Sequence, residues 1–236
     1  GVTALITNVA LQKTTFKYEI PYMLLITAVL LVMGMTGNEI TFIEGVILWI
    51  LFIAYLFYLY ILAKKGNDSG DEQSVKLYPV WKCLLFIVLG EAGVYEFSLR
   101  AALQAVDYNV LLMMAGTTIA RACGMSERFI GLTIVAFGTS LPELVTSVSA
   151  ARKGNAGIAI GNIVGSNIFN ILFVVGTVAL ICPVPFESRF VIDTVVAILC
   201  GVLLWGGTIR HKELRKPCGV VMLLCYAAYF VYLAAM

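Results

Sequence analysis

Long apolar runs recur along the whole chain, and they constrain its fold more than any other feature. A run of roughly 20 apolar residues crosses the ~30 Å hydrocarbon layer of a bilayer. The runs cover residues 20–36, 43–63, 81–122, 127–151, 155–182, 190–208 and 217–236. Only 13% of the residues are charged, whereas soluble domains hold about 25%. The sequence therefore predicts an all-α, polytopic integral membrane protein with about seven transmembrane helices.

Lysine and arginine gather in every second connection between these runs. Cytoplasmic loops carry the excess of positive charge, so we expect the basic connections inside the cell and the intervening turns outside. This pattern holds only if the chain crosses the membrane once between Lys82 and Glu127. The net charge of +2 gives no reason to expect a nucleic acid, and the expected surroundings are the lipid bilayer of the cell's inner or plasma membrane. The basic positions are Lys13 and Lys17, then Lys64, Lys65, Lys76 and Lys82, then Arg152 and Lys153, then Arg210, Lys212, Arg215 and Lys216.

Parts of the chain repeat each other at a constant spacing. Residues 45–59 match residues 219–233 at an offset of 174, with Gly, Val, Ala, two Tyr and Leu coinciding. Residues 1–6 match residues 176–181 at an offset of 175. Duplicated halves are common in secondary transporters. We expect residues 1–64 to end a first half with two transmembrane helices, residues 65–80 to form a cytoplasmic linker, and residues 81–236 to form a second half with five.

Residues 131–147 are apolar overall but hold a carboxylate, Glu143. A charge at that depth costs at least about 2.5 to 3.5 kcal/mol, so by default it faces a cavity. Pro142 has no amide hydrogen and crowds the carbonyl of Gly138, which predicts a kink or break and a new half-helix capped by Thr139 or Ser140. The alternative is a kinked packing helix whose Glu143 is protonated or snorkels.

A stripe of amides and hydroxyls follows on the next apolar run. Asn162, Ser166 and Asn170 are four residues apart and share one helix face. Calcium is held by six to eight oxygen ligands from carboxylates, carbonyls and amides, and these two runs together supply such groups. The alternative is a set of interhelical hydrogen bonds that binds no ion.

The segments GTSLPELVTS at 138–147 and GNIVGSNIFN at 161–170 resemble the second alpha-repeat of the calcium/cation antiporter superfamily, most closely the prokaryotic type of its sodium/calcium exchanger family. The resemblance implies a secondary active antiporter of two inverted halves that exchanges calcium for sodium, with no enzymatic step and no cofactor. It also implies a missing N-terminal half that carries the first alpha-repeat, with an equivalent motif about 32 residues before Gly1. The ligands it implies are Glu143 as the main one, Thr139, Ser140, Ser166, Asn170 and the backbone carbonyl of Ala136.

The chain departs from that family in two places. Many sodium-coupled members have Asp where this chain has Asn170, so exchange of calcium or another cation against protons is an alternative. Residues 92–109 look like an insertion into a helix that is continuous in the family. From other classes, an intramembrane hydrolase using Ser140 or Glu143 would need a base, and the single His211 lies outside the apolar runs. A membrane scaffold that transports nothing is the remaining option.

Overall fold

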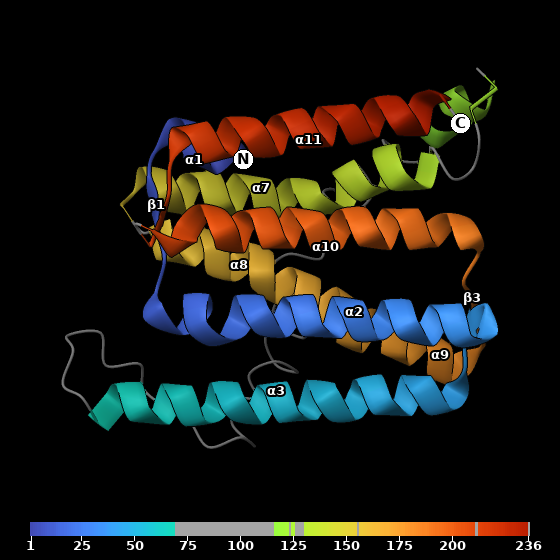
Figure 1. The fold of residues 1–236 in the computed structure, drawn as a ribbon, viewed down its shortest axis with the longest axis horizontal. Helices are drawn as coiled ribbons and strands as arrows, with labels where there is room; N and C mark the ends of the chain where they lie inside the picture. The colour runs from blue at the N-terminus through green and yellow to red at the C-terminus, as the bar shows by residue number, and fades with distance from the viewer. Residues whose placement is uncertain (69–115, 123, 126–129, 155, 211, 236) are drawn as a thin grey trace, which may run out of the picture. The chain divides into compact units, whose positions relative to one another are not determined.

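The computed structural model describes residues 1–68, 116–122, 124–125, 130–154, 156–210 and 212–235. These parts are mostly helical (Figure 1). Among the described residues, six helices are long and apolar enough to cross a membrane: Thr15–Gly37, Phe42–Lys64, Gly131–Arg152, Ala159–Ile181, Ser188–Ile209 and Lys216–Ala235. They correspond to six of the seven expected runs, and the all-α, polytopic membrane fold is confirmed. The other run, 81–122, and the insertion at 92–109 lie largely outside the described residues.

Helices dominate because a chain in lipid must satisfy its backbone hydrogen bonds internally. The α-helices are α1 (Val2–Ile6), α2 (Ile20–Gly37), α3 (Phe42–Asp68), α7 (Ala136–Arg152), α8 (Ala156–Phe169), α9 (Gly176–Ile181), α10 (Ser188–Ile209) and α11 (Lys216–Ala235). Three π-helical segments join them, η1 (Thr15–Glu19), η2 (Gly131–Val135) and η3 (Asn170–Val175). Four short strands are β1 (Val9–Ala10), β2 (Glu39–Ile40), β3 (Val184–Pro185) and β4 (Glu213–Leu214).

The chain divides into two compact units. One consists of Gly1–Ala54 with Leu141–Met236, and the other is Tyr55–Ser140. In the first unit α2 packs along α10, and α1 packs against α11. A buried cluster of Ile40, Ala179 and Phe186 lies beside the strands β2 and β3.

The strands pair in two short antiparallel ladders with the same register. Val9 of β1 lies opposite Leu214 of β4, and Val184 of β3 lies opposite Ile40 of β2. Adding 175 to the position of Val9 gives Val184, and subtracting 174 from the position of Leu214 gives Ile40, so the repeat relates the two pairs. A further backbone bond extends each ladder in the same way. The Leu11 amide donates to the Lys212 carbonyl at 2.9 Å, and the Phe186 amide donates to the Asn38 carbonyl at 2.7 Å.

Details of the helices repeat as well. Asn38 and Lys212, 174 residues apart, are the non-glycine residues with positive φ in the described chain, at 56° and 52°. Tyr55 and Tyr58 stack with ring centroids 6.2 Å apart at 25°, and so do Tyr229 and Tyr232. The equivalent strands β1 and β3 lie at opposite ends of the helices (Figure 1). The duplication is therefore confirmed, and its two copies are inverted.

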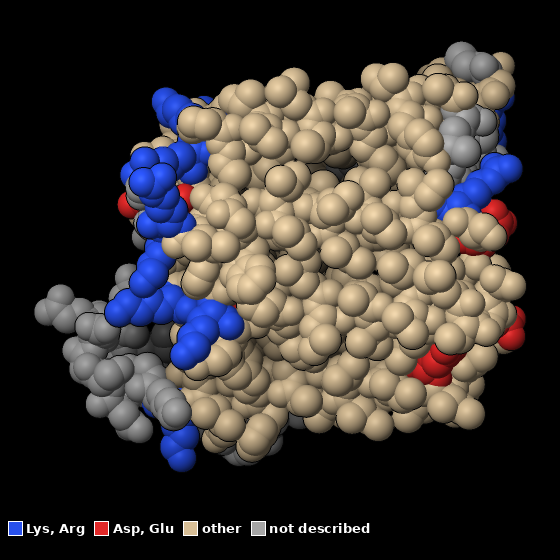
Figure 2. Space-filling model, in the orientation of Figure 1, with Lys and Arg blue, Asp and Glu red and all other residues tan. Residues whose placement is uncertain are grey.

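Charge distinguishes the two ends that the repeat makes alike. Lys and Arg crowd the end of β1 and β4, whereas acidic side chains with fewer basic ones lie at the end of β2 and β3 (Figure 2). By sequence, β4 is flanked by Arg210, Lys212, Arg215 and Lys216. At the other end, Glu39 lies in β2, and Glu187 and Arg189 follow β3. This is the separation of charge that the positive-inside rule requires of an oriented membrane protein.

Candidate functional site

Helix α7 carries the motif with Pro142, and its geometry corrects one expectation. A break at Gly138–Pro142 with a new half-helix capped by Thr139 or Ser140 is wrong, because α7 runs without interruption from Ala136 to Arg152 with Pro142 inside it. The irregular turn lies earlier, at the π-helix η2 (Gly131–Val135). In membrane helices, hydroxyl side chains and local π adjustments re-satisfy the backbone groups that a proline frees.

Thr139 provides such a hydroxyl. Its Oγ1 donates to the carbonyls of Val135 and Ala136, at 3.1 Å each. The side chain expected to begin a new helix therefore binds the carbonyls of the preceding turn instead. Ala136, one of the implied ligands through its carbonyl, is thus already an acceptor for the Thr139 hydroxyl.

Glu143 is the carboxylate of this helix, and one of its oxygens is left without a donor. Its side chain is partly buried, and Oε2 is buried with no hydrogen-bond partner among the described residues. An unpartnered buried acceptor costs about 1 to 3 kcal/mol, and more when it is charged. A cation would supply the missing partner, so the oxygen fits a ligand role.

A partly buried polar bridge joins α7 to α8 one turn beyond Glu143. The Asn162 Nδ2 donates to the backbone carbonyl of Glu143 and to the Ser147 Oγ, at 3.3 Å each. The Ser147 hydroxyl donates in turn to the Ala159 carbonyl at 3.3 Å, and Ser147 is only 1% exposed. For Asn162, the structure therefore shows the alternative that the sequence left open, an interhelical hydrogen bond.

The level of Glu143 against the polar stripe of α8 follows from the direction in which the two helices run. Only a short turn separates Arg152 from Ala156, so the two helices are antiparallel neighbours. Each turn back along α7 then matches a turn forward along α8. Side chains on an α-helix lean toward its N-terminus, which directs the Glu143 carboxylate toward the level of Ser166, one turn beyond Asn162.

The other candidate ligands make only local contacts or none in this state. The Ser166 Oγ donates to the Ile163 carbonyl of its own helix at 3.1 Å. Asn170 is exposed and is the first residue of η3. In the described chain, no hydrogen bond joins the Glu143 carboxylate to Ser166 or Asn170. Thr139 and Ser140 precede Glu143 within about one turn of α7.

Sequence reasoning missed the π-helices. η3 begins at Asn170, and π-bulges occur frequently at functional sites. Aromatic packing supports this segment, since the Phe173 ring lies 5.1 Å from that of Trp49 and 5.4 Å from that of Phe52. The Trp49 Nε1 also donates to Thr177 Oγ1 at 3.2 Å. Nothing in the local sequence distinguishes a π-turn from an α-turn, because both have the same apolar composition.

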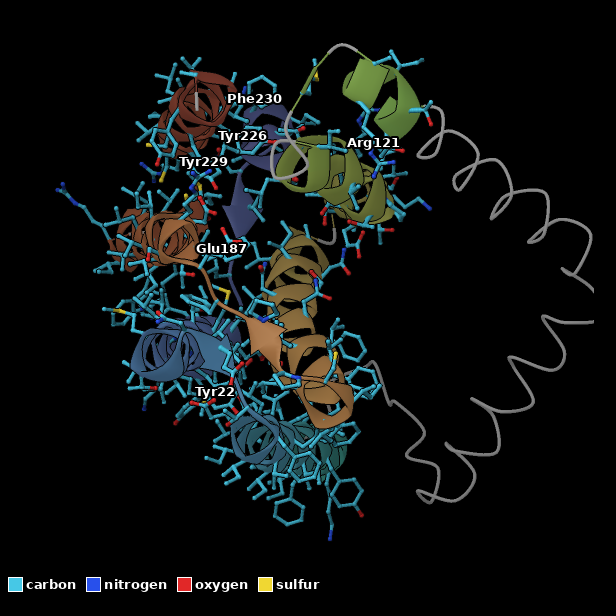
Figure 3. All side chains as sticks on the ribbon, turned by 90° about the vertical axis from the view of Figure 1, so that its right-hand side faces the viewer. Tyr22, Arg121, Glu187, Tyr226, Tyr229 and Phe230 are labelled. Atoms are coloured by element: carbon cyan, nitrogen blue, oxygen red, sulfur yellow. The ribbon has the colours of Figure 1, made fainter. Side chains whose placement is uncertain are left out.

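A second intramembrane carboxylate, Asp193, accepts a hydrogen bond from a neighbouring helix. It lies in α10, and Tyr229 of the neighbouring α11 (labelled in Figure 3) donates its hydroxyl to the Asp193 Oδ1 at 2.7 Å. Its equivalent in the repeat, Glu19, is 9% exposed and is hydrogen-bonded by the Thr15 side chain. Each of these two acids thus accepts at least one hydrogen bond from a side chain of the protein.

Comparison with known proteins gives consistent matches. The family model described as "Sodium/calcium exchanger protein" matches residues 108–235. The putative antiporter CaxA of Alkalimonas amylolytica is 33% identical over 239 residues, which covers 97% of this chain and 71% of the relative. The inner membrane protein YrbG of Escherichia coli is 30% identical, covering 94% and 68%. Solved structures of the sodium-calcium exchanger NCX_Mj match with a TM-score of 0.65 and 28% identity, covering 98% of this chain and 70% of that one.

Proposed function

This chain belongs to the sodium/calcium exchanger protein family, and we propose on that premise that it forms part of a secondary active antiporter that exchanges calcium for sodium. The cations are its cargo, and the exchange involves no covalent step. The remaining ligands come from a first alpha-repeat outside this chain, which spans 71% of the length of the CaxA relative. The protein acts as an integral protein of the cell's inner or plasma membrane.

One observation supports this proposal above the others, the unpartnered Oε2 of Glu143 in the middle of a membrane-spanning helix. Glu143 contributes the negative charge, and the Asn162 bridge holds its helix beside α8. The other ligands are the hydroxyls of Thr139, Ser140 and Ser166, the amide oxygen of Asn170 and the carbonyl of Ala136. Such a set of hard oxygens suits calcium and sodium, and a single carboxylate leaves the site dependent on charge from the other half.

The direct test removes that charge. In the complete exchanger, Glu143→Gln keeps the size of the side chain and loses its charge. We expect sodium-driven calcium uptake into vesicles to fall by at least about tenfold, since calcium affinity depends on ligand charge. The matched control is Glu187→Gln, an exposed residue in the connection before α10, which should retain uptake. Uptake at the wild-type level in Glu143→Gln, with equal amounts of inserted protein, contradicts the assignment.

Calcium/proton exchange is the second candidate, and Asn170 favours it. A neutral amide at a position where many sodium-coupled members have a carboxylate lowers the negative charge available to sodium ions. Calcium efflux driven by a pH gradient in sodium-free vesicles would support proton coupling, and efflux that requires sodium would exclude it.

A further inference from the structure

The bridge between α7 and α8 is built from side chains that lie outside the proposed ligand set. Asn162 contacts two successive turns of α7 at once, through the Glu143 carbonyl and the Ser147 hydroxyl. Ser147 closes the bridge by donating to the Ala159 carbonyl, and Ala159 is completely buried. The three bonds thus tie two turns of one helix to two turns of the other.

The bonds are individually weak, because 3.3 Å is beyond the usual range of about 2.7 to 3.2 Å for N–H···O bonds and of about 2.5 to 3.0 Å for the O–H···O bond of Ser147. Their arrangement along the two helices is what opposes sliding of α7 on α8. A helix that slides along a neighbour moves roughly 1.5 Å for each residue of slip. Any such slip takes Asn162 away from at least one of its two acceptors. The amide therefore fixes the height of α7 on α8.

We propose that Asn162 is a positioning residue of the cation site, which holds the Glu143 carboxylate at the level of Ser166 without itself binding the ion. The inference rests on the proposed function and deepens it, since it names what sets the distance between ligands from two helices. The side-chain amide donates to the Glu143 carbonyl, so its contact is with the backbone that carries the carboxylate. A cation bound by that carboxylate does not touch the amide nitrogen.

The chain supplies a matched comparison. Asn167 lies on the same helix, but its Nδ2 donates to Ile163, a carbonyl of its own helix, at 2.8 Å. It is the same residue type with a shorter hydrogen bond, and in the described chain that bond makes no link to α7. Asn167 is exposed and Asn162 is half-buried. If an asparagine of α8 mattered only through the hydrogen bond that its amide donates to a carbonyl, Asn167 should matter at least as much as Asn162.

The experiment uses the complete exchanger with Asn162→Leu, Ser147→Ala, both together, and Asn167→Leu. Two quantities are measured: the calcium concentration that half-maximally raises the melting temperature of the purified protein, and the concentration for half-maximal sodium-driven calcium flux. We expect Asn162→Leu and Ser147→Ala each to raise both concentrations by about three- to tenfold. The double variant should be no worse than the worse single variant, because both substitutions open the same bridge. Asn167→Leu should remain within about twofold of the wild type.

Several outcomes overturn the inference. It fails if Asn162→Leu keeps the wild-type calcium concentrations and lowers only the ion-free melting temperature, or if the two single effects add. It also fails if Asn167→Leu has the same effect as Asn162→Leu. Should Asn162→Leu not fold, Ser147→Ala, which removes one oxygen atom, carries the test alone. A wild-type protein that binds calcium but does not exchange it for sodium contradicts the proposed function. In that case the calcium-binding measurement still tests the positioning role of Asn162.

Discussion

The carboxylates of the membrane-spanning helices differ in the hydrogen bonds that they accept. Asp193 accepts a hydrogen bond from Tyr229, whereas the buried Oε2 of Glu143 has no partner in the described part of the chain. The cost of an intramembrane charge is the same physical quantity in both cases. The hydrogen bond from Tyr229 ties Asp193 to the packing of α10 on α11, whereas no hydrogen bond to a described residue holds the buried Oε2 of Glu143.

Asn170 offers a test at the same scale. Asn170→Asp adds a carboxylate to the proposed ligand set, and calcium affinity rises with ligand charge. We expect the calcium concentration for half-maximal flux to fall by about threefold or more. Asn167→Asp, on the same helix but outside the ligand set, is the control and should give no such gain. An unchanged or higher concentration in Asn170→Asp would remove Asn170 from the site.

The sequence predicted the chemistry of the candidate site better than its backbone. A carboxylate in an apolar run and a stripe of amides can be recognised in the sequence alone, because the free-energy cost of burying them in the membrane does not depend on tertiary detail. The continuity of α7 through Pro142 is not visible, since it depends on where the freed carbonyls find donors. Thr139 was expected to cap a new helix, and it binds the carbonyls of the turn before it. Whether Asn162 bridges helices or binds an ion could be decided only from the positions of Glu143 and Ser147.

At the scale of the elements, glycines allow helices to touch. A Cβ on Gly45 of α3 would meet the Ala179 Cβ and the Gly176 carbonyl oxygen, each at 3.0 Å. In the other copy of the repeat, a Cβ on Gly219 of α11 would meet the Ala4 Cβ and the Gly1 carbonyl oxygen, each at 2.9 Å. Small residues are enriched where membrane helices approach closely, because packing replaces the hydrophobic effect there.

Gly45→Ala should therefore destabilise the protein. The obstructing atoms include backbone, which cannot rotate away, so we expect a loss of about 1 to 3 kcal/mol. Gly37→Ala is the matched control, because a Cβ there meets nothing within 4 Å. The measurement is the melting temperature of the purified proteins in detergent. Equal melting temperatures for the two variants would show that α3 and α9 do not pack as described.

Element boundaries were predictable where lipid alone sets them. The expected run 43–63 and the observed span Phe42–Lys64 agree closely, because the thickness of the hydrocarbon layer fixes the length of a spanning helix. The short strands and the π-turns were not predicted. β1 and β4 are two residues each and are more than 200 residues apart in sequence, so no local pattern indicates their pairing.

At the scale of the whole molecule, an inverted repeat makes the two membrane faces alike in backbone, and charge alone distinguishes them. The ladders β1·β4 and β2·β3 have the same register, yet the sequence beside β4 is basic and that beside β2 and β3 is largely acidic. Positively charged loops stay in the cytoplasm. The β1·β4 end is therefore expected inside the cell.

Cysteine labelling tests this orientation. In a complete exchanger without its native cysteines, single cysteines replace Lys64, Lys153, Lys212 and Glu187. We expect a membrane-impermeant thiol reagent to label position 187 in intact cells, and the other three only after permeabilisation. Lys64 and Lys153 flank the stretch that holds the expected single crossing between Lys82 and Glu127. Opposite accessibility of these two positions would exclude that single crossing.

Because the two copies of the repeat share one backbone conformation, comparing equivalent positions shows which of them require a particular residue. Asn38 and Lys212 have the same left-handed backbone and different side chains, so that conformation demands no particular residue. Where Phe186 packs against Gly34, the equivalent positions hold Leu11 and Thr208, a smaller side chain beside a larger one. The two copies therefore divide the bulk at these positions differently. Where the side chains differ in this way and the backbone does not, the shared backbone leaves each membrane face free to carry its own residues.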